Sequence, residues 1–338
     1  MAAGNFELQQ TLDNPTPTSS DYFARAVATS GDYVIVGAER DDVSGSDAGT
    51  AYIYARTGTS WALQATLSNP SPAEADYFGY AVAISGDYAV VGAYNDDTGA
   101  SNAGSAYIYA RTGTSWALQA TLSNPAPTTA DFFGYAVAIS GDYAVVGAYA
   151  DNAGAVDAGR AYIYARTGTS WALQATLSNP DPTDSDFFGY AVAISGDYAI
   201  VGAHNEDTGA ADAGTAYTYY RTGTVWALLD TLRNPAPESY DRFATAVAVS
   251  GNYAIVGAWS DNAGGADSGS AYVYYAAPTG PVDVEVNGVS ASTSVGDVIG
   301  SASSTTRSTG VRASVASGYP LVWSPVDDAQ TPGWTPVK

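Results

Sequence analysis

The sequence contains no cysteine and a single histidine, His204. Without thiols the chain has no disulfide framework, no cysteine nucleophile and no cysteine-ligated zinc site. A lone histidine excludes metal centres that are built on several imidazoles. We therefore expect no cofactor and no metal site made from these residue types.

Basic residues are also scarce, because 12 Lys and Arg stand against 34 Asp and Glu, which gives a net charge of −22. The only lysine is Lys338, at the end of the chain. A nucleic-acid groove and a polybasic membrane patch both need clustered Lys and Arg. The composition therefore predicts that the protein does not bind nucleic acid.

Long apolar runs are missing as well. Stretches such as residues 88–94 (YAVVGAY) are far shorter than the roughly 20 residues that a membrane helix requires. The opening residues, MAAGNFELQQ, have neither the basic region nor the apolar region of a secretory signal. These features predict no membrane insertion and no signal peptide.

The chain does have an internal repeat of 55 residues. The string WALQATLSNP occurs unchanged three times, and phenylalanine and tryptophan recur in phase with it at Phe23, Phe78, Phe133, Phe188 and Phe243, and at Trp61, Trp116, Trp171 and Trp226. A fixed period of this length is the sequence signature of solenoids, propellers and arrays.

Each repeat contains four short runs that read as strands. In the second repeat they are residues 61–67, 81–85, 88–93 and 105–111. The runs are rich in β-branched and aromatic residues, and Gly, Pro, Asn and Asp bound them. No stretch of 11 or more residues shows helical periodicity. Four strands repeated five times predict an all-β fold, a five-bladed β-propeller over residues 1–280.

The two ends of the repeat region predict how the ring closes. Residues 6–12 (FELQQTL) match the strand that opens each later repeat, and residues 271–276 end the fifth repeat without such a strand after them. We expect residues 6–12 to complete the last blade, because closure removes free strand edges. The alternative is an open solenoid, which would need atypical capping repeats.

Residues 78–94 (FGYAVAISGDYAVVGAY) resemble the FG-GAP repeat of integrin-α-like propellers. Phe-Gly stands at the start of this segment in three repeats, and the first and fifth copies have Phe-Ala instead. The GAP element is reduced to Gly-Ala, as at Gly92 and Ala93. Such repeats often carry a calcium loop between these elements. Here only the tight turn SGDY is present, so we do not expect the calcium site of the family.

A second group of acids follows the Gly-Ala pair in every repeat. Their spacing does not match an EF-hand, and two interpretations remain open. The side chains of Asp and Asn either bond to local backbone groups in turns or form weak calcium sites. The candidate calcium ligands are Asp41, Asp96, Asp151 and Asp261.

Loops in an up-and-down blade alternate between its two ends. The SGDY and TGTS turns share one end, and the Asn-Pro loops and acidic loops share the other, where the residue after Gly-Ala varies between repeats. Tyrosine and tryptophan give large contact area at low entropy cost. We therefore expect this end to bind a glycan or protein of a host surface through Glu39, Tyr94, Tyr149, His204 and Trp259. The alternative is drift in unconstrained loops, with His204 as an exposed loop residue.

The sequence does not favour catalysis. Some five-bladed propellers are glycosidases, which need two carboxylates at a defined separation. Most acids here recur in every repeat, and the unique ones, such as Glu39 and Glu206, stand in the loops without a basic or histidine partner. We therefore expect a protein that is not an enzyme.

Residues 281–338 lie outside the repeat and form a second unit. Residues 282–300 alternate like a strand pair around an Asn-Gly turn, and residues 301–310 have the composition of a linker. Trp323 and Trp334 are candidate attachment residues. The segments NGVSASTSVGDV and QTPGWTPV are similar to segments of structural proteins of marine tailed bacteriophages; a disordered tail is the alternative.

These resemblances imply a non-enzymatic bacteriophage virion protein. Its propeller would be displayed for host adhesion or particle decoration, and its tail would attach it to other virion proteins or to copies of itself. The alternative is a bacterial cell-surface or secreted adhesin, which predicts a signal peptide in the genomic reading frame.

Overall fold

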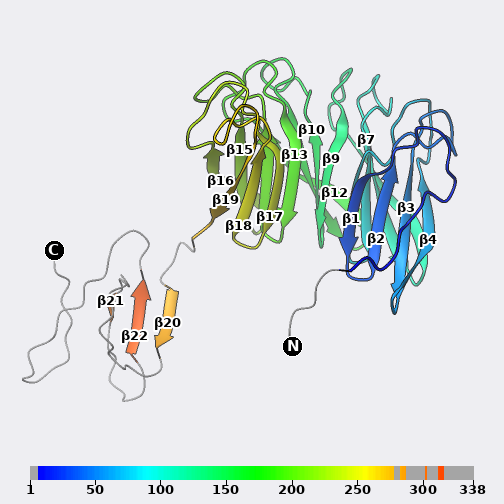
Figure 1. Ribbon diagram of the computed structural model, residues 1–338, viewed down its shortest axis with the longest axis horizontal. Helices are drawn as coiled ribbons and strands as arrows, with labels where there is room; N and C mark the ends of the chain where they lie inside the picture. Colours follow the sequence, from blue (N-terminus) through cyan, green and yellow to red (C-terminus); the bar gives the residue numbers. More distant parts are fainter. Residues whose placement is uncertain (1–6, 278–281, 287–300, 303–310, 316–338) are drawn as a thin grey trace, which may run out of the picture. The chain divides into compact units, whose positions relative to one another are not determined.

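The computed structural model describes residues 7–277, 282–286, 301–302 and 311–315. Five consecutive antiparallel sheets, which we call the first to fifth blades, stand side by side along the repeat region (Figure 1). Four blades have four strands in chain order: β1(Phe23–Ser30) to β4(Ser60–Ser68), β5(Ala81–Ser85) to β8(Ser115–Ser123), β9(Phe133–Ser140) to β12(Ser170–Ser178), and β13(Phe188–Ser195) to β16(Val225–Arg233). The fifth blade consists of β17(Phe243–Ser250), β18(Tyr253–Ala258) and β19(Ser270–Tyr275).

The inner strands of the four-stranded blades follow the pattern read from the sequence. The second strand of each is β2(Tyr33–Ala38), β6(Tyr88–Ala93), β10(Tyr143–Ala148) or β14(Tyr198–Ala203), and the third is β3(Thr50–Thr57), β7(Ser105–Thr112), β11(Arg160–Thr167) or β15(Thr215–Thr222). The described residues contain no α-helix, and therefore none that could span a membrane. The prediction of an all-β fold with five propeller blades is confirmed.

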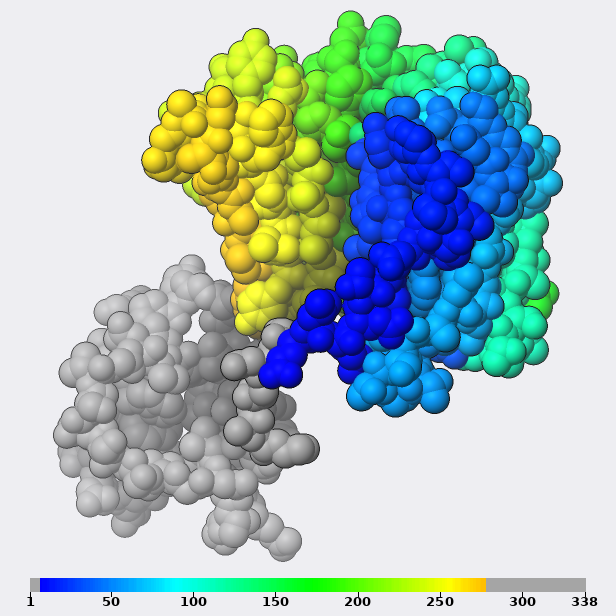
Figure 2. Space-filling model, turned by 45° about the vertical axis from the view of Figure 1, so that its right-hand side comes forward, coloured from blue at the N-terminus to red at the C-terminus, as the bar shows by residue number. Residues whose placement is uncertain are grey.

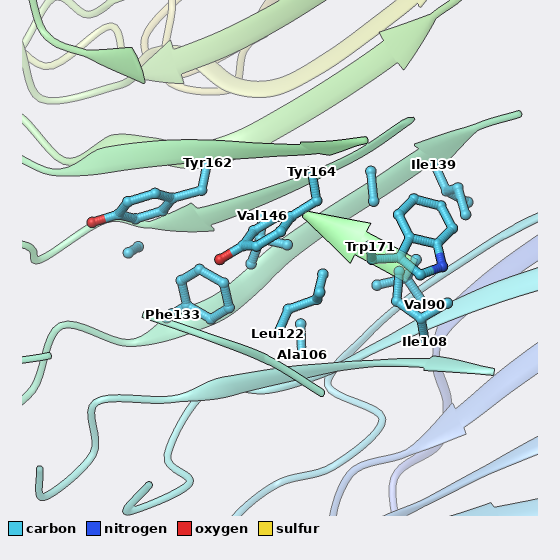
Figure 3. Close-up of a cluster of buried hydrophobic side chains, with 12 residues drawn as sticks. Val90, Ala106, Ile108, Leu122, Phe133, Ile139, Val146, Tyr162, Tyr164 and Trp171 are labelled. Carbon is cyan, nitrogen blue, oxygen red and sulfur yellow. The ribbon is translucent and has the colours of Figure 1, made fainter. Parts of the chain in front are cut away.

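The hydrophobic core lies between the blades. Val145 and Val146 are neighbours on β10 and both are fully buried, because successive strand residues point to opposite faces of the sheet. Val146 packs against the second blade and Val145 against the fourth. Figure 3 shows the first of these clusters, in which Phe133 and Trp171 of the third blade meet Ile108 of the second. An interior blade therefore buries apolar side chains on both of its faces.

Glycine sets the closest approach between blades. A methyl group added at Gly147 would overlap the carbonyl oxygen of Gly189 in the next blade. The same overlap with a carbonyl oxygen occurs in each of the four junctions, at Gly37, Gly92, Gly147 and Gly202. The backbones thus touch at one equivalent point in every junction, and this contact sets how closely successive blades approach there.

The predicted closing strand differs from the structure. Residues 7–12 belong to no strand, and the fifth blade has three strands. The segment lies instead on the first blade (dark blue in Figure 2), where Leu12 packs against the core and Trp61 donates a hydrogen bond from Nε1 to Oε1 of Gln9 at 3.1 Å. The reason is that the segment finds its hydrogen-bond partners on the first blade, at Trp61 and Tyr54, while Val273 of β19 is 68% exposed.

Contacts divide the chain into residues 1–274 and residues 275–338. In the second unit β20(Val282–Val286) pairs antiparallel with β22(Val311–Val315), which also pairs with β21(Ser301–Ala302). The stretch predicted as a strand pair therefore supplies one described strand, whose partner comes from farther along the chain. The predicted Asn-Gly turn and the candidate attachment residues Trp323 and Trp334 lie outside the described residues.

Candidate functional site: the loop end of the blades

Buried polar side chains hold the Asn-Pro loops in place at the loop end of the blades. Asn69 donates a hydrogen bond from Nδ2 to Oδ2 of Asp76 at 2.7 Å, and the same oxygen accepts the backbone N–H of Ala73 at 2.6 Å. Each Asn-Pro loop has the corresponding pair: Asn14 and Asp21, Asn124 and Asp131, Asn179 and Asp186, Asn234 and Asp241. These acids recur because each orders one loop.

The acid three residues after the Gly-Ala pair of each repeat belongs to the same network. Asp151 accepts the hydroxyl of Tyr162 at 2.7 Å, and Glu206 accepts the hydroxyl of Tyr217 at 2.6 Å. The candidate calcium ligands Asp41, Asp96, Asp151 and Asp261 are all buried. Three of them also accept the N–H of the residue two positions later, as Asp96 does from Thr98 at 2.8 Å.

The interpretation of the acidic loops as turns accounts for these contacts. Among the described residues no group of three or more His, Cys, Asp or Glu side chains could hold a metal ion. Burial raises the pKa of Asp76 to about 6 and also raises the pKa of Glu206. The network is therefore a structural cluster that is shared by neighbouring loops.

The acidic loops also connect successive blades. The N–H of Phe133 donates to the carbonyl oxygen of Ala103 at 2.8 Å, and equivalent bonds join the other blades. Ala103 lies in the acidic loop of the second blade and Phe133 begins the third. The loop end is thus one continuous surface, and the variable residues that follow each Gly-Ala pair lie on it.

Aromatic side chains form a continuous band across this surface. Tyr94 packs against Tyr80 and Tyr135 with ring centroids 4.5 and 5.5 Å apart. Tyr149 packs in the same way against Tyr135 at 4.5 Å and Tyr190 at 5.6 Å. These rings belong to a set of half-buried residues that we call the aromatic band: Tyr80, Tyr94, Tyr135, Tyr149, Tyr190 and His204.

The band carries no charge at neutral pH. Burial raises the pKa of Tyr149 to about 12 and also raises the pKa of Tyr94 and of Tyr135. Burial, together with nearby Arg242, lowers the pKa of His204 to about 4. Neutral rings whose hydroxyl groups can both donate and accept hydrogen bonds suit an amphipathic contact surface.

A model of the FG-GAP repeat matches the chain five times, over residues 8–54, 61–109, 116–164, 171–219 and 226–274. The chain belongs to the FG-GAP repeat family. No curated protein matches it. The FG-GAP propeller fold is typically non-enzymatic, and membership of this family suggests a propeller of adhesion type.

The FG-GAP signature residues serve the junctions between blades. The signature phenylalanine is fully buried, as at Phe133, where it packs against Tyr162 and Tyr164. The glycine that follows it, Gly134, has φ of 92°, a conformation that L side chains rarely adopt. The two copies with alanine keep this conformation, with φ of 70° at Ala24 and 72° at Ala244.

The structure joins three of the five predicted binding residues in the aromatic band: Tyr94, Tyr149 and His204. Trp259 of the fifth blade is 62% exposed. Glu39 is buried and forms an ion pair with Arg25 at 2.8 Å, and the guanidinium of Arg25 lies 4.5 Å from the ring centroid of Tyr80. Arg25 and Glu39 thus adjoin the band at the first blade.

Two expectations about single residues were wrong. Glu39 does have a basic partner, because Arg25 of the neighbouring strand β1 reaches across to it. His204 is not an exposed loop residue: it packs on Tyr190 with ring centroids 4.1 Å apart and on Phe187 at 5.7 Å. Both errors arose because Arg25 and Tyr190 come from the first strand of a blade, β1 or β13, rather than from the loops.

Sequence reasoning also missed half of the band. Tyr80, Tyr135 and Tyr190 stand two residues after the FG phenylalanine, where the first and fifth FG-GAP repeats have Arg25 and Thr245. This position holds tyrosine in three repeats and differs in the other two, and the position after Gly-Ala varies as well. Comparing the two variable positions would have identified the tyrosines.

Proposed function

We propose that this protein is a non-enzymatic adhesin that binds a glycan or protein on a host surface through the loop end of its blades. The observation that carries the proposal is the aromatic band. It places six neutral rings in contact across three blades, with Arg25 and Glu39 beside one end. Aromatic residues of this kind dominate the energetics of recognition surfaces.

The band suits an asymmetric partner because its two ends differ. The first blade contributes the charged pair Arg25 and Glu39, whereas the fifth contributes the exposed Trp259 and the small Thr245. The opposite end of the blades carries nearly the same SGDY turn in every repeat, which would present five copies of one small polar surface. Unequal ends therefore favour a single bound partner.

We further propose that the protein is displayed on a bacteriophage virion, with residues 281–338 attaching it to other virion proteins or to its own copies. The similarity of the tail to phage structural segments supports this setting. A bacterial cell-surface or secreted adhesin is the second candidate, and it uses the same binding surface. Calcium at the acidic loops is not required for either.

The test replaces rings on the band and measures binding of the full chain to host cells. The double variant Tyr94→Ala and Tyr149→Ala should lower the affinity at least tenfold, whereas Tyr94→Phe with Tyr149→Phe keeps the rings and should retain most of it. The control Thr59→Ala with Thr114→Ala changes exposed residues in the TGTS turns and should bind normally. Normal binding by the double alanine variant would contradict the proposed surface.

A further inference from the structure

We propose that the first-blade end of the aromatic band binds the carboxylate of an acidic sugar, and that the terminal nitrogens of Arg40 hold this carboxylate. The inference rests on the proposed function, because it names the class of ligand, a glycan that contains uronic acid, for the same surface. It is carried by an arginine that contacts two tyrosine rings and forms no ion pair with a described acid.

Arg40 belongs to a row of side chains that continues the aromatic band. Its Cζ atom lies 4.9 Å from the ring centroid of Tyr22 and 5.4 Å from that of Tyr77. Tyr77 in turn stacks on Tyr94 of the band, with ring centroids 5.5 Å apart and an interplanar angle of 22°. Cation–π contacts with two rings hold the guanidinium in place beside the band.

Backbone hydrogen bonds position both rings relative to Arg40. The N–H of Arg40 donates to the carbonyl oxygen of Asp21, the residue before Tyr22, at 3.3 Å. The N–H of Tyr77 donates to the carbonyl oxygen of Asp47 at 3.3 Å, and Asp47 lies in the same acidic loop as Arg40. The three side chains are therefore arranged before a ligand arrives, which lowers the entropic cost of binding.

No described residue accepts a hydrogen bond from the guanidinium of Arg40. Most arginines of the described repeats form an ion pair with an Asp or Glu, whereas Arg40 forms none with a described acid. Its Nε is buried and has no partner among these residues, and its terminal nitrogens are not buried. The exposed edge of the guanidinium is therefore available to an anionic group of a ligand.

The acids nearest to Arg40 in the chain already have partners. Glu39 forms its ion pair with Arg25 at 2.8 Å, and Asp41 accepts the hydroxyl of Tyr52 at 2.5 Å. A ligand carboxylate can therefore pair with Arg40 without breaking either contact.

The chemistry of this place favours a sugar that carries a single carboxylate. A planar guanidinium matches the plane of a carboxylate and can donate two parallel hydrogen bonds to it. The net charge of −22 opposes dense polyanions such as sulfated glycans, whereas one arginine balances one anionic group. Tyr22 is 51% exposed and offers a ring beside Arg40 for the apolar face of the sugar.

The repeats place this site at the first blade. Arg242 stands at the position of Tyr22 in the fifth repeat, but it forms an ion pair with Asp212 at 3.4 Å. The residues at the position of Arg40 in the later repeats carry no charge: Asn95, Ala150, Asn205 and Ser260. The acidic sugar should therefore bind at the first blade, and neutral sugars of the same glycan should lie along the band toward the fourth.

Calorimetry with defined oligosaccharides tests the inference on the full chain. The probes are an oligogalacturonate, its methyl ester, which has the same rings without the charge, and a sulfated oligosaccharide of the same length. We expect the oligogalacturonate to bind more tightly than the other two by about tenfold or more, and Arg40→Gln to remove this preference. Arg40→Lys keeps the charge without the planar fork and should keep only part of it. The matched control Arg233→Gln removes an exposed arginine at the end of β16 and should bind as the unaltered chain does.

The outcomes separate this inference from the proposed function. The inference is overturned if the unaltered chain does not bind the oligogalacturonate, if it prefers the sulfated probe, or if Arg40→Gln keeps the preference. Binding to host cells is measured in parallel, with excess oligogalacturonate as competitor. Cell binding that neither the competitor nor Arg40→Gln weakens would contradict the carboxylate site alone, whereas an unaltered chain that does not bind cells would contradict the proposed function.

Discussion

The third and fifth blades have closely similar sequences and very different surroundings. In the third blade β10 is buried on both faces, because the second and fourth blades cover it. In the fifth blade the equivalent strand β18 alternates between buried and exposed residues. The comparison shows that a repeat sequence encodes both faces of a blade, and that position in the array decides whether both are used.

The largest expected effect is at the glycine contact. Gly147→Ala should destabilise the protein by about 4 kcal/mol or more, because the new methyl group overlaps a backbone carbonyl that cannot move away alone. The matched Gly257→Ala in the fifth blade should change the free energy of unfolding by less than about 1 kcal/mol. Urea denaturation at low protein concentration measures both. Equal losses of unfolding free energy in the two variants would show that the third and fifth blades are equally closely packed at this glycine.

Substitutions in the core should show the same contrast between the third and fifth blades, with smaller changes in the free energy of unfolding. Ile163→Ala removes a fully buried side chain between the third and fourth blades and should cost about 2–4 kcal/mol. Val273→Ala at the equivalent exposed position should cost less than about 0.5 kcal/mol. The control is Val273→Thr, which preserves the shape of the side chain. A large loss for Val273→Ala in the monomer would contradict the uncovered face.

The aromatic band gives a related comparison. Tyr149 packs against rings of the band on both sides, whereas His204, at the equivalent position of the next repeat, has Thr245 in place of the second tyrosine.

The pKa of His204 is lowered to about 4, so the folded state binds this proton less tightly than the unfolded state, where the pKa is about 6.5. Its contribution to stability is complete above pH 6.5 and is lost as the pH falls toward 4.

We therefore expect the free energy of unfolding to fall by about 1–3 kcal/mol between pH 6.5 and 4 through this group. The variant His204→Gln should lack this part of the pH dependence. As the only histidine, His204 can be followed directly by NMR, and its titration midpoint should lie near 4. A midpoint near 6.5 would show that the ring is not buried in the band.

The smallest effect concerns backbone strain at the first blade. Ala24 has φ of 70° where the interior FG-GAP repeats have glycine, and it is exposed. Ala24→Gly should therefore stabilise the protein by about 0.5–1 kcal/mol. Ala26→Gly on the same strand relieves no such strain and should destabilise it by a similar amount. Thermal unfolding of the pair separates strain from a general effect of glycine.

Local patterns predicted the strands well and the long-range contacts poorly. The residues 81–85 and 88–93 were assigned correctly because β-branched runs between Gly and Asp turns leave few alternatives. Ring closure could not be read in this way, since it depends on long-range contacts: Gln9 bonds to Trp61 of the first blade, and residues 7–12 pair with no strand of the fifth. The burial of His204 depends on its packing against Tyr190, which lies on β13, whereas His204 follows β14.

The uniform glycine junction has a consequence for how the number of repeats can change in evolution. Because successive blades meet through the same contact, a recombination event between two copies of the 55-residue unit would add or remove one whole blade and leave every remaining junction intact. The nearly identical second, third and fourth units are suitable substrates for such events. Array length can therefore vary between related lineages without any new packing solution.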